Sequence, residues 1–318
     1  MTEDKKRLII IDSNAVIHRA YHALPHLTTK KGELVNAIYG FLLVFLKAIK
    51  EFKPDFVAAT FDFPAPTFRH QKYKLYKATR EKAPDELYEQ IPKVKEVLKS
   101  FNVQVFEKEK YEADDLIGTI SKSAPKKQIF PKLETIIITG DLDALQLVDK
   151  NTKVYTLRKG VKDTVLYDEE KVKEKYQGLI PEQLIDFKAL RGDPSDNIPG
   201  VLGVGEKTAI DLIKKFGSLE NLYQELRDNT EKAGEIKQSL RKKLLDCKEQ
   251  AYVSQMLAEI KKDVPIEFDL KKCGWGEYDK EKIIQIFEKY EFQTLISRLP
   301  EKEKKDKDDS IKNNLSLW

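Results

Sequence analysis

Four aspartates stand directly after three short apolar runs of the sequence, at the points where strands would end. The runs span residues 8–11, 56–61 and 135–139, and the acids that follow them are Asp12, Asp62, Asp141 and Asp143. The first and third runs are rich in β-branched residues, and such short apolar runs predict buried parallel strands. Because ligands bind at the carboxyl edge of an open parallel sheet, we expect these carboxylates to converge there.

Two further segments add acids at the start of a helix and in a loop. Residues 111–115 read Tyr-Glu-Ala-Asp-Asp, and residues 192–197 read Gly-Asp-Pro-Ser-Asp-Asn. Taken singly, these acids have structural explanations, because acids suit the positive end of a helix dipole and aspartate favours turns. Taken together, the acids would repel one another unless cations neutralised them, and such oxygen ligands suit Mg²⁺ or Mn²⁺. The set consists of Asp12, Asp62, Glu112, Asp114, Asp115, Asp141, Asp143, Asp193 and Asp196.

Divalent ions held by such a set favour phosphoryl transfer. Two ions roughly 4 Å apart would clamp the attacking and leaving oxygens of a phosphodiester and lower the pKa of bound water. Covalent catalysis has little support, because the histidines fall in the first quarter of the chain and show neither a zinc nor a triad spacing. They are His18, His22, His26 and His70.

A basic segment with interleaved aromatic residues follows Asp62. Its cations and aromatic residues are Phe68, Arg69, Lys72, Tyr73, Lys74, Tyr76, Lys77, Arg80 and Lys82, and only Glu81 opposes the positive charge. Cations neutralise phosphates and aromatic rings stack on unpaired bases, so this composition favours a single-strand binding element. A solvated basic loop is the alternative. Its position after a candidate metal ligand favours the first reading, because such a loop would overhang the strand-end crevice.

A glycine-rich turn at residues 200–208 predicts a second nucleic-acid contact. The nucleotide-binding phosphate loop needs Lys directly after its last glycine, and here Glu206 intervenes. The turn of a helix-hairpin-helix fits better, because Gly203 and Gly205 would let helix amides approach a DNA phosphate while Lys207 and Thr208 add contacts. The carbonyls of the turn would also suit K⁺. A purely structural helix turn stays open.

Periodic segments between and after the strand runs define the elements that position these residues. Apolar spacing predicts helices over 35–51, 114–122, 182–191 and 207–216, and a late strand over 264–268. Alternating strands and helices in the first half predict an open α/β sheet, and the second half reads as largely helical.

Composition sets the outer limits. The 318 residues carry a net charge of only +4 from 57 basic and 53 acidic side chains, so the distribution of charge matters more than its total. No secretory or membrane segment opens the chain, and two distant cysteines form no zinc pair, which together predict a cytoplasmic protein without a membrane partner. Residues 301–310 are almost entirely charged and predict a solvated linker.

Six motifs, taken in order, resemble the 5′-nuclease domain of bacterial DNA polymerase I over about residues 5–298. They are IIIDSNAVIHRAYHAL, FDFPAPTFRH, YKATR, YEADD, TGDLDALQLV and GDPSDNIPGVLGVGEKTA. The resemblance implies a PIN-like (Rossmann-like) α/β core with a helical arch, followed by a helix-three-turn-helix domain. We expect the core at 1–175 with its arch at about 63–95, the duplex-binding helical domain at 176–298, and a flexible tail at 299–318.

The resemblance also implies roles for individual residues. Asp12, Asp62, Glu112 and Asp114 would hold the first metal ion, and the other five acids would serve the second site or its water shell. Asp12, Lys77 and Arg80 would act in catalysis, Tyr76 would stack on a base and Arg69 would contact the 5′ strand. Ser13 and His18 depart from the usual Gly and Tyr of relatives, and neither change removes a ligand.

The implied function is a 5′-3′ exonuclease and flap endonuclease that acts on branched, flapped or nicked DNA in Okazaki-fragment processing and repair. Because the chain stops at Trp318, we expect a nuclease without polymerase activity, and we expect it to be a monomer. The C-terminal residues Asn314, Leu315, Leu317 and Trp318 resemble a sliding-clamp-binding peptide, with a random apolar terminus as the alternative. A PIN-type ribonuclease and an inactive DNA-binding protein are the competing functions.

Overall fold

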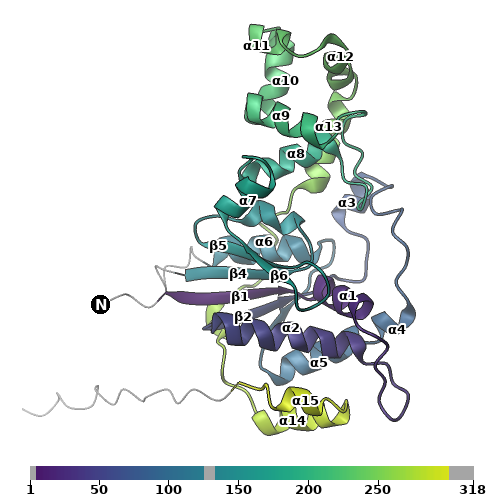
Figure 1. Ribbon diagram of the computed structural model, residues 1–318, viewed down its shortest axis with the longest axis vertical. Helices are drawn as coiled ribbons and strands as arrows, with labels where there is room; N and C mark the ends of the chain where they lie inside the picture. Colours follow the sequence, from purple (N-terminus) through teal and green to yellow (C-terminus); the bar gives the residue numbers. More distant parts are fainter. Residues whose placement is uncertain (1–4, 125–132, 301–318) are drawn as a thin grey trace, which may run out of the picture.

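The computed structural model describes residues 5–124 and 133–300, and a six-stranded sheet forms its centre (Figure 1). The strand order is β3-β2-β1-β4-β5-β6; the first five strands run parallel and β6 is antiparallel to β5. The strands are β1 (Lys6–Asp12), β2 (Phe56–Thr60), β3 (Gln104–Phe106), β4 (Leu133–Thr139), β5 (Thr152–Leu157) and β6 (Thr164–Tyr167). The three strands expected from the apolar runs are confirmed.

The register of the central strands places their carboxyl ends side by side. Asp12 pairs with Thr60 of β2, and Ile11 pairs with Ile138 of β4. Strands buried on both faces read as continuous apolar runs, which is why the sequence marked β1 and β4 so clearly. The acids that follow these strands therefore leave the sheet at one edge.

Two helical layers cover the sheet. Ile9 and Ile11 pack on one face with helices α1 (Ser13–Ala23), α2 (Asn36–Phe52), α5 (Ile91–Ser100), α14 (Lys280–Lys289) and α15 (Gln293–Ile296). Leu8 and Ile10 pack on the opposite face with α6 (Ala113–Ser123), the 3₁₀ helix η2 (Asp143–Leu147) and α7 (Glu169–Lys175). The predicted helices at 35–51 and 114–122 are thus confirmed as α2 and α6.

The basic segment after β2 carries two short helices, α3 (Phe68–Lys72) and α4 (Asp85–Tyr88). The chain then continues through α5 to β3. In Figure 1 the segment runs along the side of the molecule where α1 begins.

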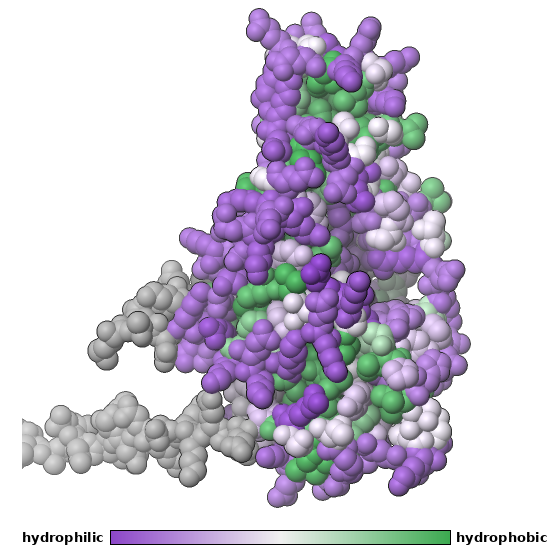
Figure 2. Space-filling model, in the orientation of Figure 1, coloured by the Kyte–Doolittle hydropathy of each residue, from purple (hydrophilic) through white to green (hydrophobic). Residues whose placement is uncertain are grey.

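A stack of helices rises from the α6 side of the sheet (Figure 1). Its members are α8 (Leu184–Arg191), α9 (Glu206–Phe216), α10 (Leu219–Asp228), α11 (Glu231–Gly234), α12 (Gln238–Asp246) and α13 (Lys248–Ala258). The face drawn in Figure 2 is largely hydrophilic over these helices, with apolar patches between them. This arrangement confirms an α/β sheet followed by helices.

Two details of the second half differ from the sequence prediction. The helix expected at 182–191 begins as a 3₁₀ turn, η3 (Pro181–Gln183), before α8. The strand expected at 264–268 does not form, because the chain returning from α13 is held by side chains instead of a strand ladder; the Val264 amide donates to Thr119 Oγ1 at 3.0 Å.

The end of the second half packs away from the helical stack. A short 3₁₀ turn, η4 (Leu270–Cys273), leads to α14 and α15, which lie on the α2–α5 face of the sheet. Tyr278, Phe287 and Leu295 share that core with Phe101, which caps the C-terminus of α5. The segment 176–298 is therefore divided between two packing environments, and its identity as one duplex-binding domain stays a prediction.

No helix within residues 5–124 and 133–300 is both long and apolar enough to cross a bilayer. The charged tail and the C-terminal peptide at 313–318 lie outside the described residues.

Gly118 in the middle of α6 lies against the chain that returns from α13. A Cβ at position 118 would come within 2.6 Å of the Lys261 carbonyl oxygen and 2.7 Å of Ile260 Cγ2. The helix propensity gained by Ala is about 1 kcal/mol, and overpacking costs about 1–3 kcal/mol or more when backbone must move. We expect Gly118→Ala to lower the free energy of unfolding by about 1 kcal/mol or more in urea denaturation.

The matched control is Gly234→Ala in α11, where no atom lies within 4 Å of the added Cβ. This change should be neutral or slightly stabilising. Equal stabilities for the two variants would show that the chain beside Gly118 is not packed as described.

Candidate metal and nucleic-acid site

Asp12 and Thr139 join the ends of the two central strands. Asp12 is 4% exposed and caps α1, where its carboxylate accepts from the Ala15 amide at 3.1 Å. The hydroxyl of Thr139 donates to Asp12 Oδ2 at 2.6 Å and accepts from the Asp141 amide at 2.9 Å. These bonds aim both carboxylates along the same edge of the sheet.

The N-terminus of α6 faces the end of β2. Asp62 Oδ1 accepts from the Ala113 amide at 2.8 Å, and the Asp62 amide donates to Asn14 Oδ1 at 3.2 Å. Asp114, in the first turn of α6, lies close enough to Asp12 and Asp141 to feel their charges, and its buried Oδ1 has no hydrogen-bond partner within the described residues. Burial of a carboxylate oxygen without a partner is unfavourable, so this atom needs a donor or a cation.

Burial and mutual repulsion raise the pKa values of several of these acids. Burial raises the pKa of Asp12 to about 7, with Asp62 and Asp141 adding repulsion. The pKa of Asp143 also rises to about 7 through burial and the charge of Asp141. Burial together with the charges of Asp12 and Asp141 raises the pKa of Asp114 well above its usual value. These three carboxylates are therefore harder to ionise than exposed aspartates.

Lys188 of α8 links two members of the set. Its Nζ contacts Asp143 and lies 2.6 Å from Asp193 Oδ2. Burial opposes ionisation of Asp193, but the Lys188 charge and two hydrogen bonds from Ser195 lower the pKa of Asp193 to about 2. Sequence reasoning missed Lys188; its position five residues before Asp193, at the end of a predicted helix, was the available signal.

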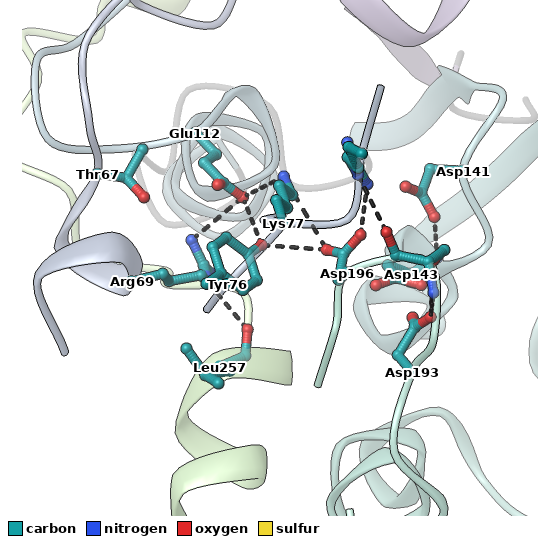
Figure 3. Close-up of polar contacts among 12 residues, drawn as sticks. Thr67, Arg69, Tyr76, Lys77, Glu112, Asp141, Asp143, Asp193, Asp196 and Leu257 are labelled. Carbon is teal, nitrogen blue, oxygen red and sulfur yellow. Dashed lines mark hydrogen bonds and ion pairs between the residues drawn. The ribbon is translucent and has the colours of Figure 1, made fainter. Parts of the chain in front are cut away.

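Two residues of the basic segment, Tyr76 and Lys77, lie between Glu112 and Asp196 (Figure 3). Tyr76 donates its hydroxyl to Glu112 Oε2 and lies equally close to Asp196 Oδ2, both at 3.1 Å. Lys77 Nζ lies 3.1 Å from Glu112, and Arg80 forms an ion pair with Asp196. The segment therefore lies over the acids that come from α6 and from the 192–197 loop.

The backbone of Lys77 is held in an unusual conformation. Its φ of 55° lies in the left-handed region, which is uncommon for a non-glycine residue. The Lys77 amide donates to the Asp196 carbonyl at 2.9 Å, and Asn197 Nδ2 donates to the Leu75 carbonyl at 2.6 Å. Local strain of this kind persists only where neighbouring contacts fix the chain.

Three predicted roles do not fit the geometry. Asp115 is fully buried, and its oxygens accept four hydrogen bonds, from Arg69 twice and from the amides of Glu112 and Lys261, so no lone pair remains for a metal ion. Arg69 is 2% exposed and cannot contact a DNA strand in this conformation. Tyr76 is 3% exposed and packs edge-on against His70, so its ring offers no face for a base.

These errors share a physical cause. In the fold, cations and acids that lie far apart in the sequence form pairs with each other. The composition of a segment does not show such pairing. Lys72 remains exposed and Tyr73 half-buried, so both are accessible as predicted for a nucleic-acid contact.

The glycine-rich turn precedes α9. Gly203 adopts a φ of +77°, which favours glycine, and Gly205 caps the helix. Lys207 is exposed and Thr208 half-buried in the first turn, and Leu202 is 76% exposed at the tip. The predicted helix at 207–216 is confirmed as α9, and its N-terminus is accessible to a large ligand.

Within residues 5–124 and 133–300, no three His, Cys, Asp or Glu side chains already stand in ligating geometry. Four of the acids instead pair with cations of the protein: Lys77, Arg80 and Lys188 contact Glu112, Asp196, Asp143 and Asp193. The donor chemistry nevertheless fits hard divalent cations, because the cluster is made of oxygen ligands and contains an unpartnered carboxylate oxygen.

Comparisons with known proteins agree with this geometry. The family model for the 5′-3′ exonuclease N-terminal resolvase-like domain matches residues 7–177, and the model for the 5′-3′ exonuclease C-terminal SAM fold matches residues 179–281. DNA polymerase I of Bacillus subtilis is 44% identical over 301 residues, covering 95% of this chain and 33% of the polymerase. DNA polymerase I of Caldicellulosiruptor bescii is 44% identical over 295 residues, covering 92% of this chain and 33% of that protein. The chain spans about a third of the length of these relatives.

Solved structures share the fold at low sequence identity. A T5 5′-exonuclease with bound divalent zinc ions has a TM-score of 0.65 at 20% identity, covering 80% of this chain and 90% of the exonuclease. The catalytic core of Rad2 in complex with a DNA substrate has a TM-score of 0.54 at 21% identity, covering 93% of each chain. These structures show a shared fold, and the two family models, which follow one another over most of the sequence, show that the chain belongs to the 5′-3′ exonuclease family.

Proposed function

We propose that this protein is a structure-specific 5′ nuclease that hydrolyses DNA phosphodiesters near the junction of single- and double-stranded DNA. The observation that carries the proposal is the meeting of two groups at the carboxyl edge of the sheet. One is the acid cluster around Asp12 and Asp114, and the other is the basic segment whose Lys77 and Arg80 reach the same acids. A scissile phosphate needs both metal ions and cations around it.

Eight acids would hold two divalent ions, Mg²⁺ in the first instance and Mn²⁺ as a substitute. They are Asp12, Asp62, Glu112, Asp114, Asp141, Asp143, Asp193 and Asp196. Ions bound there would lower the pKa of a coordinated water and stabilise the charge that develops on the leaving oxygen. The T5 5′-exonuclease structure contains divalent ions, which supports a metal-dependent site here.

The chain's own cations would then serve the phosphate. Lys77 and Arg80 lie beside Glu112 and Asp196, and once other cations neutralise these acids the two side chains are free to bind the scissile phosphate. Tyr76 holds Glu112 and Asp196 in place across the boundary between α6 and the 192–197 loop. Products with a 5′-phosphate and a 3′-hydroxyl would follow from in-line attack.

The helical stack would bind the duplex, with K⁺ as a candidate at the turn before α9. The Rad2 core is solved with a DNA substrate, which supports DNA as the ligand of this fold. The proposal also includes a role in Okazaki-fragment processing and repair. It further includes action as a monomer and clamp binding through residues 314–318. Deletion of residues 313–318 should abolish clamp pull-down, and unchanged binding would remove the clamp from it.

The test is cleavage of a 5′-labelled flap duplex with Mg²⁺, with an EDTA control and a single-stranded RNA of the same flap sequence. We expect cutting at the junction, loss of cutting in EDTA and little cutting of the RNA. Cleavage of RNA alone would favour a PIN-type ribonuclease, which needs neither the duplex grip nor the basic segment. Flap binding without metal-dependent cutting would favour a DNA-binding protein.

The exposed Lys207 gives a separate test of the duplex contact. We expect Lys207→Ala to weaken flap-duplex binding and to reduce the slope of log K against log salt by about one, because one phosphate contact is lost. Fluorescence anisotropy in EDTA measures both. Lys150→Ala is the matched control. Lys150 is exposed just before β5, at the edge of the sheet opposite the acid cluster, so its loss should leave the slope unchanged. Equal slopes for both variants would place the duplex elsewhere.

A further inference from the structure

The last two residues of α13 and the non-helical chain that follows them, residues 257–264, lie along α6 and η2. We call this segment the strap. Side chains hold its backbone at three places: Arg69 bonds the Leu257 and Glu259 carbonyls, Gln146 bonds Ala258 and Ile260, and Thr119 bonds Val264. Gly118 leaves room for the strap against α6.

Of the three side chains that hold the strap, Arg69 makes the most hydrogen bonds. Its guanidinium donates to both oxygens of Asp115 at 2.8 Å, to the Leu257 carbonyl at 2.9 Å and to the Glu259 carbonyl at 2.6 Å. The remaining N–H capacity faces Glu112, with Nη1 3.5 Å from Oε2. A guanidinium has five N–H donors, so Arg69 has none left for a phosphate.

Asp115 connects Arg69 to the first turn of α6, which carries the candidate metal ligands. Its Oδ2 accepts from the Glu112 amide at 3.1 Å, and its Oδ1 accepts from the Lys261 amide at 2.9 Å. Glu112 caps α6, and Asp114 lies in the first turn of the same helix. The buried pair therefore fixes three things together: the base of the basic segment at α3, the first turn of α6, and the strap from the helical stack.

We infer that Arg69 is a positioning residue which, through Asp115 and the strap, holds Glu112 and Asp114 in the arrangement that binds the divalent ions. The inference rests on the proposed metal-dependent function and assigns Arg69 a role without contact to DNA. Buried partners that orient metal ligands commonly change metal affinity by about 10- to 100-fold when removed.

Arg69→Lys tests this, because lysine keeps the charge but loses the planar fork that bonds both oxygens of Asp115. We expect Mn²⁺ binding to the DNA-free protein, measured by calorimetry or electron paramagnetic resonance, to weaken about 10-fold or more. Flap-duplex binding in EDTA, measured by anisotropy, should change less than about 3-fold. Asp115→Asn keeps the side-chain shape and should weaken Mn²⁺ binding similarly, so it answers the question if Arg69→Lys does not fold.

Two controls separate positioning from other roles. Lys72→Ala removes an exposed cation from the same short helix and should weaken DNA binding with Mn²⁺ binding unchanged. Phe287→Leu destabilises the buried core that α14 forms on the face of the sheet opposite the strap, and should leave Mn²⁺ binding intact. A general loss of stability would weaken Mn²⁺ binding in Phe287→Leu as well, which would overturn the inference.

The outcomes also distinguish this inference from the proposed function. Normal Mn²⁺ binding with weakened DNA binding in Arg69→Lys would make Arg69 a DNA contact and overturn the inference alone. A wild-type protein that binds no Mn²⁺ would overturn the proposed function and this inference with it. Weakened Mn²⁺ binding with intact DNA binding, in both Arg69→Lys and Asp115→Asn, supports positioning.

Discussion

Replacing Asp141 by Asn should reduce flap cleavage in saturating DNA and Mg²⁺ by about 1,000-fold or more, which corresponds to about 4 kcal/mol in the barrier. Asp141 Oδ1 accepts from the Asp143 amide at 2.8 Å, and an Asn side chain can keep that bond. The change therefore removes charge with little change of shape. Asp141 also acts on the pKa values of Asp12, Asp114 and Asp143, so the acid cluster would lose a shared member.

The measurement is single-turnover cleavage of a 5′-labelled flap duplex, with flap binding measured separately in EDTA. Binding should be retained or slightly strengthened in Asp141→Asn, because the lost charge is negative. Asp163→Asn, an exposed change in the turn between β5 and β6, is the matched control and should cleave at the wild-type rate. A cleavage rate within 10-fold of wild type for Asp141→Asn would exclude this acid from the metal site.

The strands and the acids that follow them could be predicted from the sequence because both signals are local. A run such as Ile9–Ile11 is buried on both faces and shows no polar interruption until Asp12, so the strand and its carboxylate are marked together. The rule that ligands bind at the carboxyl edge of a parallel sheet then brings distant acids to one place. The register of β1 with β2 and β4 confirms that step.

The partners of the charged side chains could not be predicted, because pairing depends on tertiary contacts. Arg69 and Asp115 are 46 residues apart, and each has a plausible role of its own in the sequence. In the fold the two side chains are buried and form hydrogen bonds to each other, because a buried charge needs a hydrogen-bonded partner of opposite charge. Lys188 was missed for the opposite reason: a single lysine on a helix is usually solvated, and only the fold places it between Asp143 and Asp193.

The sequence also did not predict that the segment carrying α14 packs against the sheet. The apolar spacing of α14 indicates a helix with one buried face, but it does not say against which surface that face packs. The aromatic contacts of Trp275 and Tyr278 with Phe101 settle it in the fold. Local periodicity thus predicts elements, and shape complementarity between distant side chains decides which elements meet.

Removing divalent metal should lower the melting temperature, and the loss should be larger at pH 8 than at pH 6. Without metal, burial and neighbouring charges raise the folded-state pKa values of Asp12 and Asp143 to about 7, above the ordinary value of 3.8. The folded protein then binds more protons than the unfolded chain between about pH 4 and pH 7. Stability of the metal-free protein therefore falls as pH rises through this window and levels off above it.

Bound metal reverses this dependence because it takes the place of the protons. Mg²⁺ at about 100 times its Kd adds about 2.7 kcal/mol, which for a chain of this size raises the melting temperature by about 4 °C. Scanning calorimetry at pH 6, 7 and 8, in EDTA and in Mg²⁺, measures both effects. His18 and His70 have pKa values lowered by burial, so they oppose the acids as the unfolded histidines titrate near pH 6.5 and reduce the step between pH 6 and pH 7.

Asp143→Asn provides the decisive comparison, because it removes one of the acids whose pKa rises to about 7 while Lys188 keeps its bond to Asp193. In EDTA this variant should be more stable than wild type at pH 8, and Mg²⁺ should stabilise it much less. Asp163→Asn should respond to metal and pH as wild type does. A melting temperature that is independent of Mg²⁺ in the wild-type protein, or an Asp143→Asn variant less stable in EDTA at pH 8, would mean that the buried acids are balanced by the protein's own cations and that divalent ions are not what they require.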